Sequence, residues 1–71
     1  MPDAHRPEQR AELSSLATAL GDLTRRVAAI AERAAEGRDD EVSTELFAVE
    51  RALRGAGRRL ERLTTRARHD R

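Results

Sequence analysis

The sequence predicts an all-α protein, a single antiparallel two-helix hairpin of the coiled-coil type. Apolar residues recur at alternating spacings of three and four in both halves of the chain. The chain has 71 residues, of which 38% are charged and only Phe47 is aromatic. A short polar segment, EGRDDE, separates the two periodic halves. This periodicity and composition are typical of long helices packed along an apolar seam.

The first helix is expected over about residues 7–36. Pro7 suits the first turn, where a missing backbone N–H costs nothing. The apolar positions form an unbroken heptad pattern over more than three heptads: Leu13, Leu16, Leu20, Leu23, Val27, Ile30 and Ala34. This seam is expected to pack against the second helix.

A loop is expected at about residues 37–39. Gly37 suits a left-handed residue that ends a helix, and Asp39 or Asp40 suits the N-cap of the next one. The second helix is then expected over about residues 40–67. Its apolar seam comprises Val42, Leu46, Val49, Leu53, Ala56, Leu60, Leu63 and Ala67.

The short loop forces an antiparallel pair, and its length predicts a register. Pairing Ala34 with Val42 places Leu20 opposite Ala56 and Gly21 opposite Gly55, where two glycines would allow a close approach. In the same register two ion pairs are expected between the helices, Asp22 with Arg54 and Arg26 with Glu50.

A second row of small residues accompanies the first seam: Ala17, Gly21, Thr24, Ala28, Ala31 and Ala35. Small residues permit further helices to pack closely, and one seam alone is thin support for so short a chain. We therefore expect a dimer that forms a four-helix bundle, with a tetramer and a monomeric hairpin as the alternatives. Candidate oligomer contacts are Gly21, Ala28, Phe47 and Gly55.

The charge is distributed unevenly. Residues 1–49 hold six arginines and ten acids, a balance of −4, whereas residues 50–71 hold eight arginines and three acids, a balance of +5. The surplus suits contacts with phosphates, or a solvated face on one side of a helix. Candidate nucleic-acid contacts are Arg51, Arg54, Arg58, Arg59 and Arg62. Neither Asn nor Gln accompanies these arginines for base readout.

The composition argues against several classes of function. The absence of cysteine excludes disulfides, zinc–thiolate clusters and thiol sensors. No catalytic, cofactor-binding or metal site is expected, because Ser14, Ser15 and Ser43 have no base in reach and His5 and His69 lie near termini that are expected to fray. No signal peptide or membrane span is visible, so a cytoplasmic location is expected and a membrane partner is not.

The segment DEVSTELFAVERAL, residues 40–53, resembles the second-helix signature of the metal-sensitive transcriptional repressors that sense copper or formaldehyde. LTRRVAAI, residues 23–30, is similar to their first helix. The resemblance covers about half the chain and implies helical-hairpin dimers or tetramers that bind DNA through arginine-bearing helices. The family's sensing cysteine would fall at Asp39 or Asp40. Its later histidine and cysteine would fall near Thr64 and Arg68, so its sensing ligands are not present here.

Two functions follow from the sequence. The first is a non-catalytic, oligomerising helical hairpin that serves as a small protein–protein interaction, regulatory or scaffolding module. It would contact itself and a protein partner of unidentified nature, without a cofactor. The alternative is a DNA-binding transcriptional regulator that resembles the repressors but lacks their sensing ligands.

Overall fold

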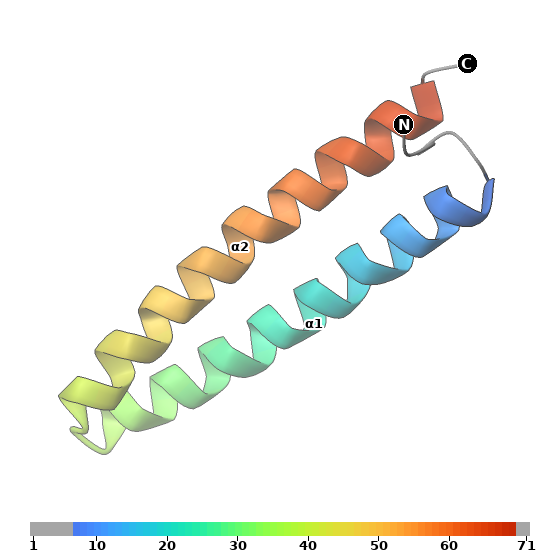
Figure 1. The fold of residues 1–71 in the computed structure, drawn as a ribbon. Coiled ribbons are helices and arrows are strands. Elements are labelled where there is room, and N and C mark those ends of the chain that lie inside the picture. The colour runs from blue at the N-terminus through green and yellow to red at the C-terminus, as the bar shows by residue number, and fades with distance from the viewer. Residues whose placement is uncertain (1–6, 70–71) are drawn as a thin grey trace.

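The protein is a helical hairpin in the computed structural model, which describes residues 7–69 and, of residues 67–69, the backbone alone. Helix α1 spans Pro7–Glu36 and helix α2 spans Asp40–His69. The two helices run antiparallel along their whole length, with the connecting loop at one end (Figure 1). The predicted all-α hairpin is therefore confirmed. The termini, which the sequence predicts to fray, lie outside the described residues.

The loop ends α1 with a residue in the left-handed conformation, and that residue is Arg38 rather than Gly37. Arg38 has a φ of 64°, whereas Gly37 has no positive φ. The Arg38 N–H donates to the Ala35 carbonyl at 3.1 Å, and the Asp39 N–H donates to the Ala34 carbonyl at 2.9 Å. These two bonds define a Schellman motif whose left-handed position falls one residue later than the sequence suggested.

Helix α2 begins at an aspartate cap. The Asp39 carboxylate accepts a hydrogen bond from the Val42 N–H at 3.4 Å, and the Asp39 carbonyl accepts the first intrahelical bond, from the Ser43 N–H at 2.9 Å. Of the two aspartates that the sequence left open, Asp39 is therefore the N-cap. Asp40 and Glu41 follow in the first turn, at the positive end of the helix dipole.

The contact between the helices is formed by buried and half-buried residues at heptad spacing. On α1 they include Leu13, Ala17, Leu20, Thr24, Val27, Ala31 and Ala34; on α2 they include Ser43, Leu46, Glu50, Leu53, Gly57, Leu60 and Thr64. A Cβ atom at Gly57 would lie 3.8 Å from Leu20 Cδ2. Leu20 therefore lies against Gly57, one residue beyond the Ala56 that the loop length predicted.

Half of the predicted seam lies elsewhere. Leu16, Leu23 and Ile30 are exposed, although the sequence placed them between the helices. Small residues of the second row, Ala17 and Ala31 among them, occupy the contact instead. Small side chains let the two backbones approach closely, so the helices pack through the row of smaller residues.

The polar residues in this contact satisfy themselves within their own helices. The Thr24 hydroxyl donates to the Leu20 carbonyl at 2.7 Å, and the Thr64 hydroxyl donates to the Leu60 carbonyl at 2.9 Å. Such bonds to the preceding turn let a threonine lie in a helix interface without an unpaired hydroxyl.

The two predicted ion pairs between the helices do not form. Asp22 instead pairs with Arg25 at 3.6 Å and with Arg26 at 4.0 Å, both on α1. The buried Glu50 pairs with Arg54 of its own helix. Residues three and four apart on a helix are neighbours, so each carboxylate finds an arginine there without reaching across the seam.

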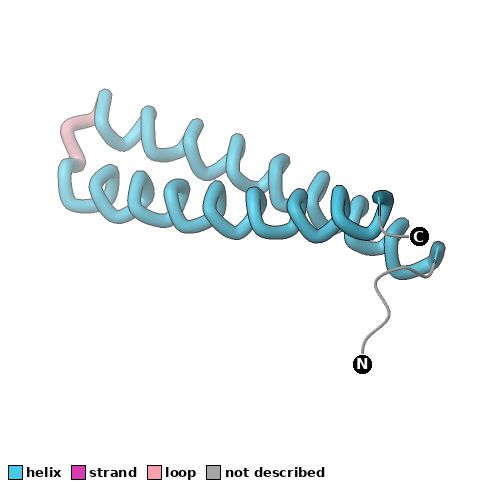
Figure 2. Tube along the Cα trace, turned by 90° about the horizontal axis from the view of Figure 1, so that it is seen from above, coloured by secondary structure: helices cyan, strands magenta, loops and turns pink. Residues whose placement is uncertain are grey.

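The hairpin is long and thin. Its Cα radius of gyration is 15.6 Å and its extents are 51 × 17 × 15 Å, whereas a globular chain of this length has a radius of about 11 Å. Figure 2, turned by 90° from Figure 1, shows that α1 and α2 lie side by side in this view as well. Neither helix of the described chain combines the length and apolar character needed to cross a bilayer.

Candidate functional site: the leucine face

An unpartnered apolar surface is the most prominent feature of the hairpin. Six large apolar side chains are between 43% and 54% exposed. We call this surface, together with the exposed Ala56, the leucine face; its members are Leu16, Leu23, Ile30, Val42, Val49, Ala56 and Leu63. Along each helix they recur every seven residues, so each helix contributes one straight row.

The two rows lie on the same broad side of the hairpin. Each member directly precedes a residue of the inter-helix contact, as Leu23 precedes Thr24 and Val49 precedes Glu50. In an antiparallel pair the helices are related by an approximate two-fold axis perpendicular to their common plane. Both rows are displaced in the same sense from the contact residues of their own helix. The two-fold axis therefore places both rows on the same face of the hairpin.

The interior of the hairpin is small in comparison with this face. Among the described residues Ala31 is the only buried apolar residue, and no large side chain is fully buried. The other buried residues are Ser43, Glu50 and Thr64. Large contiguous apolar surfaces of this kind are typical of interaction and ligand-binding sites, so the leucine face is the candidate functional site.

The four predicted oligomer contacts lie outside the leucine face. Gly21, Ala28 and Phe47 are half-buried on the opposite broad side, at the positions that follow contact residues by one. Gly55 lines a shallow groove on α2 beside Ala56 and Leu63. A Cβ atom at Gly21 would meet Arg25 of its own helix at 3.8 Å, and one at Gly55 would meet Arg58 at 3.8 Å. The two glycines therefore do not form the predicted close approach.

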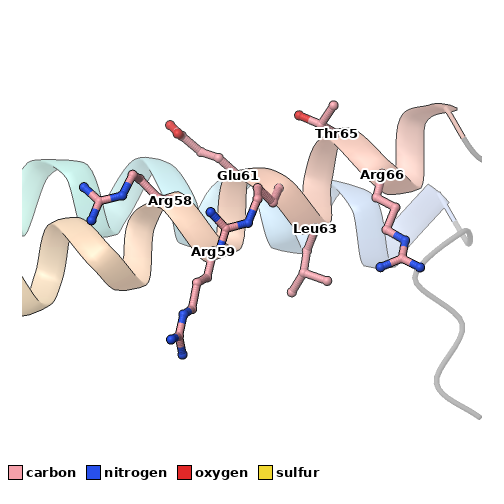
Figure 3. A pocket seen from close by; sticks show the side chains of 7 residues that line it. Arg58, Arg59, Glu61, Leu63, Thr65 and Arg66 are labelled. Carbon is pink, nitrogen blue, oxygen red and sulfur yellow. The ribbon is translucent and has the colours of Figure 1, made fainter.

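The predicted arginine row projects outward from α2. Arg51, Arg54, Arg58, Arg59 and Arg62 are all exposed, and within the described residues only Arg54 of these five forms an ion pair. Several of them surround a shallow hollow of about 760 Å³ on the outer surface of α2. Figure 3 shows Arg59 and Leu63 projecting to one side of α2, and Glu61 and Thr65 to the other. The row can contact an extended anion, but it does not enclose a small ligand.

No cluster of side chains suited to holding a metal ion occurs in the described part of the chain. No group of three or more His, Cys, Asp or Glu side chains that could hold a metal ion occurs among residues 7–66, whose side chains the structure describes. The Ser43 hydroxyl donates to the Asp40 carbonyl at 3.2 Å. His5 and the side chain of His69 lie outside the described parts.

The sequence pattern identifies the apolar residues of the leucine face, but we expected them to pack between the two helices, where they do not lie. The signal was present in the width of the apolar arc. Each helix carries two adjacent apolar rows, such as Leu13, Leu20 and Val27 beside Leu16, Leu23 and Ile30. One neighbouring helix covers only one flank of such an arc, and the second row stays exposed in the hairpin.

The chain was compared with protein-family models, with curated proteins and with solved structures, and none matches.

Proposed function

We propose that the chain is a non-catalytic, oligomerising helical hairpin that acts through protein–protein contact, as a small regulatory or scaffolding module. The observation that carries this proposal is the leucine face, which spans both helices and has no partner within the chain. Two hairpins that pack against each other through the leucine face would form a four-helix bundle. A cytoplasmic location is part of the same proposal.

The direction of the apolar arcs supports a bundle. In a four-helix bundle each helix touches two neighbours, so its apolar arc points between them toward the bundle axis. The arc of α1 has this property, because its Leu13–Leu20–Val27 row meets α2 and its Leu16–Leu23–Ile30 row faces outward. A second hairpin on the leucine face would bury both rows of every helix in one core.

Sedimentation equilibrium tests self-assembly directly, since a monomer has a mass of 7.9 kDa. The wild-type chain is expected to sediment at twice that mass or a higher multiple, and the variant Leu23→Glu/Ile30→Glu as a monomer. The matched control, Ala29→Glu/Ala48→Glu, adds the same charge at exposed positions away from the leucine face and is expected to assemble. We expect a dimer with a dissociation constant in the micromolar range. A wild-type chain that remains monomeric at about 0.1 mM would therefore refute self-assembly.

The second candidate function is DNA binding, as in the repressors that the sequence resembles. The exposure of the arginine row and its shortage of carboxylate partners support this candidate. Phosphate contacts would give an affinity for random duplex DNA that falls steeply between 50 and 200 mM salt, typically by a factor of about 10³ or more for six contacts. Fluorescence anisotropy would measure this affinity for the wild type and for Arg58→Glu/Arg62→Glu, whose changed residues lie off the leucine face. Absence of binding at low salt would exclude the candidate.

A further inference from the structure

Charged residues border the leucine face in the same order on both helices. The outer edge on α1 carries Glu12, Ala19, Arg26 and Arg33; the outer edge on α2 carries Glu45, Ala52, Arg59 and Arg66. Each of these residues is exposed and lies three or four positions from members of the leucine face, so it shares their side of the helix. In Figure 3, Arg59 projects beside Leu63 in this way.

Each edge is therefore acidic at the start of its helix and basic toward the end. Because the helices are antiparallel, the glutamate of α1 lies at the open end of the hairpin and the glutamate of α2 lies near the loop. The arginines have the reverse arrangement. Of the four edge arginines only Arg26 has a carboxylate within 4.0 Å among the described residues, namely Asp22.

A second copy placed face to face on this surface would complement both edges. A two-fold axis between the two faces makes each pair of directly facing helices antiparallel, whether the loops lie at the same end or at opposite ends. The acidic start of each edge then meets the basic end of another. With the loops at the same end, Glu12 is level with Arg66 of the partner subunit, and Glu45 is level with Arg33 of the partner subunit.

The size of the surface also suits a second copy. The whole broad side of the hairpin has an outline of 51 × 17 Å, roughly 870 Å², so this side is large enough to supply the 800 Å² or so that each partner buries in a standard interface. An apolar centre with a charged rim is the usual organisation of such interfaces.

We propose that the charged edges of the leucine face select a second copy of this chain as its partner, with each glutamate meeting an arginine of the opposing copy. This inference rests on the proposed self-assembly and adds the feature that selects the partner and the antiparallel orientation of the facing helices. Opposite charges at an interface rim set orientation and exclude wrong partners more than they raise affinity. The edges therefore act as a specificity device around an apolar contact.

Two oppositely charged variants test the proposal. Glu12→Arg/Glu45→Arg makes both edges basic at both ends, and Arg33→Glu/Arg66→Glu makes both edges acidic at both ends. Alone, each variant is expected to dimerise about tenfold or more weakly than the wild type at low salt, because like charges meet at every edge contact. Mixed, they are expected to form a heterodimer of near wild-type affinity, which native mass spectrometry resolves by mass.

The control variant Glu32→Arg/Glu61→Arg makes the same change of charge as Glu12→Arg/Glu45→Arg, but at exposed positions away from the leucine face. It is expected to dimerise like the wild type. Salt at about 0.5 M should remove most of the difference between the variants, since it screens exposed charges. Rescue by mixing also rules out misfolding as the reason for weak self-association.

The outcomes separate this inference from the proposed function. If Leu23→Glu/Ile30→Glu abolishes assembly while both edge variants dimerise normally, the leucine face is an assembly site but its edges do not select the partner. Mixing without heterodimer formation likewise overturns the selection. A monomeric wild type overturns both proposals.

Discussion

The loop offers the sharpest test of the structure, because its left-handed position holds an arginine although a glycine directly precedes it. Arg38 holds the left-handed conformation with a φ of 64°, and Gly37 precedes it without a positive φ. We predict that Gly37→Ala and Arg38→Gly each stabilise the hairpin. If Gly37 held the left-handed position, as its sequence context suggested, Gly37→Ala would instead be destabilising.

The magnitudes follow from the local geometry. The left-handed conformation costs a residue with a Cβ atom about 1 kcal/mol or more. Glycine avoids this cost in the folded state, but its more flexible unfolded chain offsets part of the gain in stability. Arg38→Gly should therefore gain about 0.5 kcal/mol in the free energy of unfolding. A Cβ atom at Gly37 would lie 3.5 Å from the Arg33 carbonyl oxygen, which is an ordinary contact. Gly37→Ala should gain a similar amount by restricting the unfolded chain, roughly 0.4–1 kcal/mol.

Thermal unfolding monitored by circular dichroism, at one fixed chain concentration, measures both changes. A gain of 0.5 kcal/mol corresponds to a rise in Tm of roughly 2–4 °C for a domain of this size. Arg38→Ala is the matched control, since it removes the guanidinium but keeps the Cβ atom, and it should not gain. If Arg38→Gly is no more stable than Arg38→Ala, or Gly37→Ala lowers the Tm, the assignment of the loop is wrong.

Three further changes probe α2 by the same unfolding measurement. Asp39→Ala removes the N-cap and should cost about 1 kcal/mol, and an unchanged Tm would place the cap elsewhere. Gly57→Ala should be tolerated, whereas Gly57→Val should cost about 1–3 kcal/mol because its extra methyls meet Leu20, 3.8 Å from the Cβ position; equal stabilities would contradict the register. Glu50→Leu should raise the Tm, because it removes a buried carboxylate that is paired with Arg54 alone, and a lower Tm would show that this pair stabilises the contact.

The sequence determined the hairpin well because its signals are local and repeated. Seven-residue spacing persists through both halves, and the interruption at EGRDDE contains the residues that end one helix and begin another. The predicted register was wrong by one residue, because Leu20 lies against Gly57 and not Ala56. The loop also uses Arg38 as its left-handed residue, which no propensity favours over the adjacent Gly37. Such a choice depends on how the two helices pack, and packing is not a property of the loop sequence.

The candidate site was harder to predict for a different physical reason. Periodicity shows which residues share an apolar arc, but it does not show which neighbour covers each flank of the arc. Leu16 and Ala17 are adjacent in sequence, and packing places the smaller one in the contact and leaves the larger one exposed. The choice depends on how closely the helix axes approach, which small residues on both helices determine together.

The division of residues between the two sides of each helix indicates where the free energy of folding lies. The contact within the hairpin contains Ser43, Glu50, Gly57 and Thr64, which bury little apolar area. The leucine face carries six further large apolar side chains and leaves them about half exposed. Burial of this face in an assembly would contribute roughly 25 cal/mol of stabilisation per Å² of apolar surface. Folding and assembly should therefore be coupled, so that the Tm rises with chain concentration.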